Sequence, residues 1–267
     1  CLASCRNNDY VRSIPASATA VMRIDGAVVA QSDKVLSLLP FGDKAAEALD
    51  LSRDIYAFET IDGNLGMCAK VKDSDRLLEI MKKAATSEVR RQGDYRLADI
   101  NNSWAVGFDD NALLVLGPVS AAALPDAQRS LVRMLKQDED ASILARPMYS
   151  RLDSIGSRVA LVAQVQALPE KLAAPFMLGA PKGADASQVA VAAGVDVKDG
   201  IMRIDCENFS FQKSVDRELH KSHSVLRPIK GDFKNCMSQS QLFALFANVN
   251  GKDFLPLLQS DRSLQAV

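Results

Sequence analysis

The stretch that decides the fold is Thr19-Ala20-Val21-Met22-Arg23-Ile24-Asp25-Gly26. Its apolar residues are interrupted only by Arg23, which predicts a strand that is buried on most of its surface. The run from Ala27 to Leu39 that follows predicts a helix, with Ser32 or Asp33 as a possible N-cap and Pro40 as its end. The stretch is therefore the start of a strand-helix unit.

The same outline returns twice further along the chain. Residues 159–166 predict a second strand that leads to a helix start at 168–172, and residues 242–251 predict a third that leads to 252–258. The three strands end on similar triplets, which are Arg23-Ile24-Asp25, Gln164-Val165-Gln166 and Asn248-Val249-Asn250. This recurrence predicts an internal repeat. The alternative is that an α+β protein produces such segments independently.

A predicted hairpin and a helix follow each of the first two strand-helix copies. Residues 54–60 and 65–71 flank Asp62-Gly63, a strong turn dipeptide, and residues 73–75 cap a helix over 76–85. Residues 188–197 and 201–211 flank a second turn, and a charged helix starts near Ser214. We therefore expect an α+β fold of repeated strand-helix-hairpin-helix units, with largely antiparallel sheets packed by helices.

The segment between the first two copies predicts three more short strands, at 95–100, 103–108 and 112–117, and a helix over 120–136. From these patterns we expect four regions. They are a signal remnant and tether at 1–13, a first α+β unit at 14–140, a second at 141–235, and an incomplete third at 236–267.

The composition is that of an ordinary globular protein. The chain has 267 residues, of which 48% are apolar and 24% are charged, and its net charge is −1. This near-neutral balance gives no general attraction to nucleic acid, and no basic cluster with interleaved aromatic residues occurs. We therefore expect no nucleic-acid partner, and the sequence carries no signal of a cofactor.

The first residues predict a lipid anchor. Leu2-Ala3-Ser4-Cys5 matches the bacterial lipobox, in which small residues before the cysteine admit the signal peptidase. The polar run of residues 6–9 that follows is suited to a tether. We expect Cys5 to be the lipidated residue, so that the protein is attached to a membrane; the alternative is that these cysteines belong to an ordinary cytosolic chain.

The remaining cysteines are Cys68, Cys206 and Cys236, an odd set without the spacing of a metal site. Cys68 and Cys206 fall in apolar predicted strands, where a free thiol acts as a small buried apolar group. We expect no disulfide framework.

The start at Leu2-Ala3-Ser4-Cys5 and the pattern of residues 10–25, from Ile14-Pro15 to Asp25, resemble a family of predicted lipoproteins from Bacteroides-type bacteria, a domain of unknown function (number 4836). The resemblance is sharpest over residues 2–39. It implies a location in the cell envelope, at the outer membrane, with the fold facing the periplasm or the exterior. That family has no established catalytic residues, so the resemblance implies no site.

One cluster has the side chains of a metal site. Asp216, His220 and His223 are spaced i, i+4 and i+7 on a predicted helix, so all three could point at one divalent cation such as zinc. The surrounding basic residues favour a solvated charged face instead. The sequence therefore offers these three residues only as weak metal candidates.

Motifs of other chemistries are absent from the sequence. No Gly-x-Ser-x-Gly elbow and no phosphate-binding loop occurs, and the two histidines leave few general bases for a nucleophile. Asp153-Ser154-Ile155 matches the short acceptor pattern for O-glycosylation of envelope proteins.

The expected function is therefore that of a lipid-anchored envelope lipoprotein with a non-catalytic binding or assembly module. The alternative is a periplasmic hydrolase or metal-dependent enzyme whose site the sequence does not show. A deep pocket lined by groups with perturbed pKa would favour the enzyme, and an open groove or apolar patch would favour the binder. A carrier of apolar molecules, a third option, requires a large apolar cavity between sheet and helices.

Overall fold

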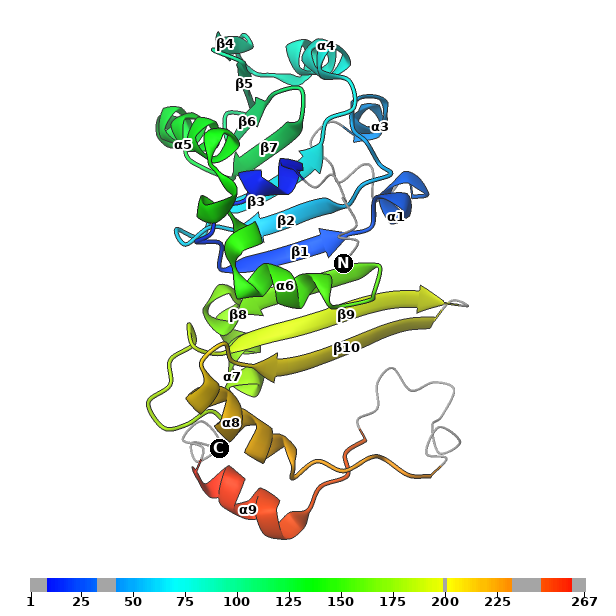
Figure 1. Cartoon of the computed structure of the whole chain (residues 1–267), viewed down its shortest axis with the longest axis vertical. Coiled ribbons are helices and arrows are strands. Elements are labelled where there is room, and N and C mark those ends of the chain that lie inside the picture. Colours follow the sequence, from blue (N-terminus) through cyan, green and yellow to red (C-terminus); the bar gives the residue numbers. More distant parts are fainter. Residues whose placement is uncertain (1–8, 33–41, 199–200, 232–245, 261–267) are drawn as a thin grey trace. The chain divides into compact units, whose positions relative to one another are not determined.

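A computed structural model describes residues 9–32, 42–198, 201–231 and 246–260 (Figure 1). Its strands and helices confirm an α+β fold. The strands are β1 Ala20–Ile24, β2 Ile55–Glu59, β3 Leu65–Lys70, β4 Arg90–Gln92, β5 Tyr95–Ile100, β6 Trp104–Phe108, β7 Ala112–Gly117, β8 Val159–Gln164, β9 Ala190–Lys198 and β10 Ile201–Phe209. The α-helices are α1 Gly26–Ala30, α3 Ala45–Ala48, α4 Ser74–Ala84, α5 Leu124–Lys136, α6 Pro147–Asp153, α7 Glu170–Met177, α8 Lys213–His223 and α9 Gly251–Ser260. Short 3-10 turns are η1 Asp9–Ser13, η2 Gly42–Lys44, η3 Ala121–Ala123, η4 Glu139–Ala141, η5 Ile143–Ala145 and η6 Val165–Ala167.

The strands form one sheet in the order β10-β9-β8-β1-β2-β3-β7-β6-β5-β4. The deciding strand β1 lies inside this sheet and pairs antiparallel with β2 on one side and with β8 on the other, so that Val21 lies opposite both Phe58 and Val162. The predicted turn at Asp62-Gly63 joins β2 and β3, and Gly63 supplies the positive φ of 77° that this turn needs.

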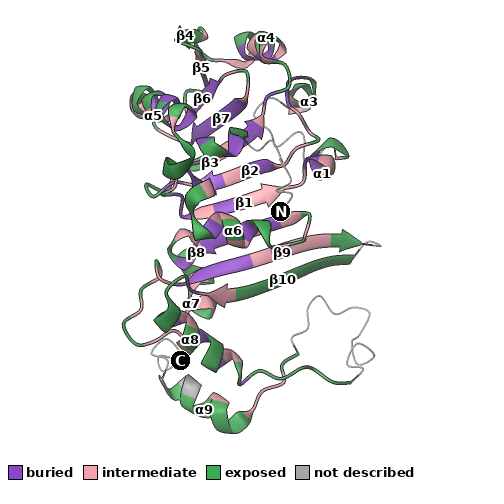
Figure 2. Cartoon of the chain, in the orientation of Figure 1, coloured by how far each residue is buried: buried purple, intermediate pink, exposed green. Residues whose placement is uncertain are grey.

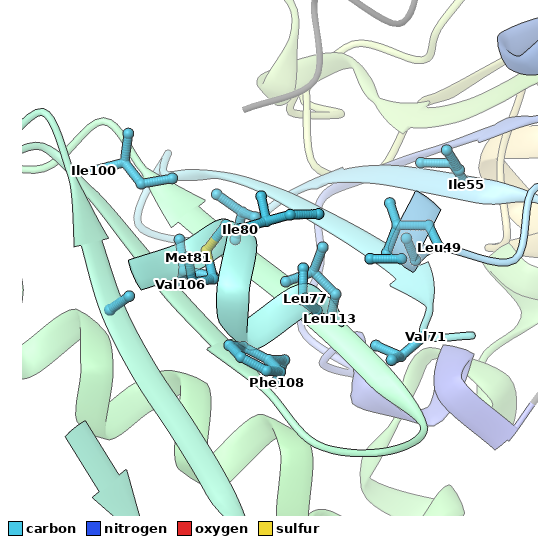
Figure 3. Packing of buried hydrophobic residues seen from close by; sticks show 14 of the residues in the cluster. Leu49, Ile55, Val71, Leu77, Ile80, Met81, Ile100, Val106, Phe108 and Leu113 are labelled. Carbon is cyan, nitrogen blue, oxygen red and sulfur yellow. The ribbon is translucent and has the colours of Figure 1, made fainter. Parts of the chain in front are cut away.

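Helices α4 and α5 cover opposite faces of the sheet. Neighbouring residues of a strand point to opposite faces, and on β6 Phe108 packs in the cluster that contains Leu77 and Met81 of α4. A Cβ added to the adjacent Gly107 would instead meet Leu131 and Leu135 of α5 at 3.3 Å. Side chains fill the space between α4 and the sheet (Figure 3).

The seam between β1 and β8 is tied together by side chains. The Nη2 of Arg23 donates to the carbonyl oxygens of Ile155 (2.7 Å) and Ser157 (3.1 Å), and its Nη1 lies 3.6 Å from Asp54 Oδ2. At the end of β1, Asp25 accepts from Arg158 Nε at 3.0 Å. Asp25 also caps α1 by accepting from the amide of Ala27.

The chain divides into two compact units, which are Cys1–Ala163 with Ala192–Glu207, and Gln164–Val191 with Asn208–Val267. This division differs from the boundaries expected at residues 140 and 235, because β8, β9 and β10 hydrogen-bond into the same sheet as β1. The second unit has a small core of its own, made by Val165, Val189, Val191, Val215 and Leu219.

Most predicted elements are present, and a few differ. The order strand, helix, hairpin, helix runs from β1 to α4 and again from β8 to α8. The cap of α1 is Asp25, and Asp33 lies outside the described residues. In the third copy, residues 242–245 lie outside them as well, while 246–250 form only an isolated bridge, Val249 to Leu226, ahead of α9.

The two predicted strand cysteines differ in burial. Cys68 is fully buried on β3, as expected, whereas Cys206 is exposed because β10 lies at the end of the strand order. None of the described helices combines the length and apolar composition that crossing a bilayer requires.

Candidate ligand-binding groove

A groove of about 700 Å³ lies beside α5 in the first unit, and we call it the α5 groove. Three segments far apart in sequence form it: the loop of residues 15–17, the β2–β3 turn of residues 60–64, and the chain from Val119 to Arg146. Its volume falls within the range of small-molecule and peptide-sized sites.

Backbone hydrogen bonds hold the loop segments in place. The amide of Ala16 donates to the carbonyl of Ala141 (3.1 Å), and Gln137 Nε2 donates to the carbonyl of Ile14 (3.0 Å). In the turn, Thr60 and Asn64 bond each other through both backbone and side-chain atoms, which fixes the exposed Ile61 at the groove's rim. The groove walls are therefore preformed.

The floor of the groove is apolar. Leu116 of β7 and Ala127 and Met134 of α5 are all buried, and each lines the groove. Ala123 and Ala127 have small side chains, which leaves room between this side of α5 and the β2–β3 turn. The three floor residues are already buried, so the apolar surface that a ligand would newly cover includes that of the exposed Ile61 at the rim.

Charged side chains stand on the walls of the groove. Arg133 of α5, whose Nη2 donates to Ser130 Oγ at 3.2 Å, and Arg146 both line it. Two carboxylates do so as well, but Asp126 is paired with Arg129. The charges of the lining residues balance, and the two arginines can bind an acidic group on a ligand.

The groups with strongly raised pKa lie elsewhere in the first unit. Burial raises the pKa of Tyr10, Tyr56 and Cys68 well above their ordinary values. Tyr10 OH donates to the Asp54 carbonyl at 2.7 Å, and Cys68 Sγ donates to the Tyr10 carbonyl at 3.3 Å. A thiol with a raised pKa is a poor nucleophile at neutral pH, so these residues serve packing.

The weak metal candidates lie on α8 in the second unit. His220 Nδ1 is 3.4 Å from Asp216 Oδ2, but Asp216 Oδ1 accepts the amide of Ser210 ahead of the helix. His223 Nε2 contacts Asn208 Oδ1 at 2.5 Å. In the described parts of the chain, no three His, Cys, Asp or Glu side chains come together in metal-binding geometry. Asp216 and the two histidines are thus not brought to one point.

One further residue named from the sequence can be placed. Ser154 ends α6, where its Oγ accepts from Arg151 Nη1 (2.8 Å) and donates to the Arg151 carbonyl (2.6 Å). Cys5 lies outside the described residues. The α5 groove itself was missed in the sequence, because its wall residues are common types without a local motif.

Comparisons with known proteins place the chain in a family. No curated protein matches its sequence significantly. Among solved structures, crystal form I of TP0453 is 10% identical with a TM-score of 0.44, covering 84% of this chain and 89% of that one. Crystal form III of TP0453 is 10% identical with a TM-score of 0.46, covering 84% and 90%. These likenesses are too weak to bear on function.

The family comparison is stronger. The model of a domain of unknown function, DUF4836, matches residues 14–266. This match confirms the domain of unknown function that the opening pattern of the chain resembles, and it covers far more than half of the sequence. The chain therefore belongs to the DUF4836 family of domains of unknown function.

Proposed function

We propose that this protein is a lipid-anchored lipoprotein of the cell envelope whose folded part binds an acidic segment of a partner protein in the α5 groove. The observation that supports binding is the groove itself, which is preformed and open and joins an apolar floor to the guanidinium groups of Arg133 and Arg146. Covering the exposed Ile61 at the rim supplies affinity, and bidentate bonds from arginine to a carboxylate supply orientation.

The anchor is supported by the sequence alone. Leu2-Ala3-Ser4-Cys5 supplies the lipobox, and the residues after Cys5 supply a polar tether. The anchor keeps the groove in the same compartment as the partner's segment, which raises the effective concentration of each for the other.

The anchor is tested by fractionating the native host. The wild type is expected in the membrane fraction, released by detergent, with an acylated N-terminal Cys5 in the mass spectrum. Cys5→Ser should move the protein out of that fraction, whereas Cys206→Ser, at an exposed cysteine of the fold, should leave it there. An unmodified Cys5 in the native protein would refute the anchor and leave the groove proposal standing.

The groove is tested by photo-crosslinking in the same host. The crosslinker p-benzoylphenylalanine at Ile61, on the rim of the groove, should give a discrete adduct with a partner. At Leu172, which is similarly exposed (57% against 69%) but does not line the groove, it should not. Equal adducts from both positions, or none from Ile61, would contradict binding in the groove.

Charge reversal tests whether Arg133 contributes to binding of the partner in the α5 groove. Arg133→Glu should reduce the Ile61 adduct about tenfold, because one charge-assisted hydrogen bond contributes about 1.5–3 kcal/mol. Lys82→Glu, at an exposed basic position of α4 that does not line the groove, is the control and should change the yield little.

We also propose that the two strand-helix-hairpin-helix segments are copies of one unit. The support is that the strand order β10-β9-β8 continues as β1-β2-β3, so the two hairpins flank an antiparallel pair of first strands. An experimental structure tests this. Superposition of β1 to α4 on β8 to α8 with the same connections would support it, and connections of different handedness would contradict it.

A further inference from the structure

Strand β10 is a free edge of the sheet. It ends the strand order, and among the described residues no strand lies beyond it. Ile201, Met202 and Ile204 are more than half exposed, and Figure 2 shows the strand in the colour of exposed residues along most of its length. An exposed edge with apolar side chains is a surface on which another strand can add.

The two faces of the β9–β10 hairpin differ in chemistry. Glu207 of β10 pairs with Arg151 of α6, and Asp196 of β9 accepts from Ser157 Oγ just after that helix (2.7 Å), so both acids point to the α6 side. Because side chains alternate along a strand, Met202 and Ile204 point the other way. The opposite side of β10 is thus apolar and exposed.

The corresponding edge of the first hairpin is occupied. There, β3 follows β2 as β10 follows β9, and the outer side of β3 pairs antiparallel with β7 over six residue pairs, from Leu65 opposite Gly117 to Lys70 opposite Ala112. The outer edge of β3 thus pairs with an antiparallel strand, and β10 has the corresponding edge in its own hairpin.

The charges of β10 are complementary to a second copy of themselves. Arg203 and Asp205 flank Ile204, and both side chains are exposed (73% and 62%) and already paired with each other at 2.6 Å. If two β10 strands run antiparallel with Ile204 opposite Ile204, each Arg203 faces the Asp205 of the other copy. Registers centred on Arg203 or on Asp205 place like charges opposite each other, which is unfavourable.

We propose that two copies of this protein pair through β10, antiparallel and centred on Ile204. The pairing places Met202 opposite Cys206 of the second copy, so the apolar side chains on the face away from α6 become continuous across the contact. Its occupant, its direction and its register all follow from Arg203-Ile204-Asp205, and it depends on neither the anchor nor the α5 groove.

Charge reversal tests the register. Sedimentation velocity of the purified protein between about 1 and 100 μM should show a dimer. Arg203→Glu and Asp205→Lys, each alone, should weaken dimerisation about tenfold or more, because two attractive cross-strand pairs become repulsive. The double variant Arg203→Glu/Asp205→Lys should restore it, since the two signs are then exchanged. Arg129→Glu, at an equally exposed ion pair, should have no effect.

A disulfide test is independent of charge. In a Cys206→Ser background, Ile204→Cys should give a disulfide-linked dimer under mild oxidation, because paired residues of antiparallel strands lie within disulfide distance. Val197→Cys, similarly exposed on β9, should not. The proposal would be overturned by a monomer at all concentrations, or by a dimer that neither single charge reversal weakens. Equal yields of the disulfide-linked dimer from Ile204→Cys and Val197→Cys would also overturn it.

Discussion

At the scale of single residues, the fully buried tyrosines decide how the first turn η1 is held on the sheet. The Tyr10 ring lies 6.1 Å from the ring of Tyr56, which lies 6.5 Å from that of Tyr149 on α6. The Tyr10 hydroxyl is satisfied by the Asp54 carbonyl. Three elements are joined by this stack, and none of its members lines the α5 groove.

The tyrosines predict a loss of stability in alkali. Burial raises the pKa of Tyr10 and Tyr56 above the ordinary value of 10.0, so the folded protein keeps protons that the unfolded chain releases. This contribution is complete below pH 10 and is lost as the pH rises from there towards the folded pKa. The free energy of unfolding, measured by urea titration, should fall by about 1.4 kcal/mol per pH unit for each tyrosine.

The variant Tyr10→Phe separates this effect from general alkaline damage. It should lower the free energy of unfolding at pH 7 by about 1 kcal/mol, since the Asp54 carbonyl loses its partner. Above pH 10, the free energy of unfolding should fall less steeply with pH, by the contribution of one tyrosine. Burial also raises the pKa of the partly exposed Tyr95, but less, so Tyr95→Phe should reduce the slope only over a narrow pH range just above 10. The assignment fails if Tyr10→Phe leaves the slope at the wild-type value.

At the scale of elements, local patterns predict the strands and their turns but not their partners. The three short strands β5, β6 and β7, the Asp62-Gly63 turn and the Asp73 cap of α4 are all visible in sequence, and the structure contains them. The pairing of β1 with β8 depends on residues about 140 positions apart, and no local periodicity encodes it. The burial of Cys206 was wrongly predicted for the same reason, because a strand's position in the sheet decides its exposure.

Arg23 is the element-scale residue whose role the sequence hides. It interrupts an apolar strand, and its side chain, only 13% exposed, joins β1 to the loop ahead of β8. Arg23→Ala should lower the free energy of unfolding by about 3 kcal/mol, because two carbonyls and Asp54 lose a charged partner.

The matched control is Arg158→Ala at the same seam. Its ion pair with Asp25 is about half exposed, so the loss should stay below about 1 kcal/mol in the same denaturant titration. Equal losses from the two variants would show that Arg23 acts only as a surface charge.

The hairpin of β2 and β3 contains a second element-scale constraint, at Gly66. It lies opposite Phe58, and a Cβ at Gly66 would come within 2.2 Å of the Phe58 ring. Gly66→Ala should therefore cost about 1–3 kcal/mol of stability through displacement of the buried ring. Gly156→Ala, where an added Cβ meets nothing within 4 Å, should be nearly neutral when both melting temperatures are compared.

At the scale of the whole molecule, neither the α5 groove nor the division into two compact units is encoded by local sequence patterns. The α5 groove is built from residues 15–17, 60–64 and 119–146, each an ordinary loop or helix in sequence. The two units are likewise discontinuous in sequence, since the first includes residues 192–207 from the second half of the chain. Both depend on which distant segments meet, and that information is not local.

The sizes of the two cores predict unequal resistance to opening. Among the described residues, fifteen buried ones form the cluster beneath α4, whereas five form the cluster that contains Leu219 of α8. Less buried apolar surface gives a smaller free energy of local opening. In native-state hydrogen exchange, the amides of α8 should therefore exchange well before those of β3 and β7.

Two leucines that are both completely buried supply the decisive comparison. Leu219→Ala should lower the opening free energy of α8 amides by about 2–5 kcal/mol while leaving β7 amides unchanged, and Leu77→Ala should do the reverse. Because β9 contributes residues to both units, its amides should respond partly to each variant. If Leu219→Ala instead reduced the protection of β7 as much as that of α8, the two units would unfold as a single cooperative body, and the small core would depend on the large one for its stability.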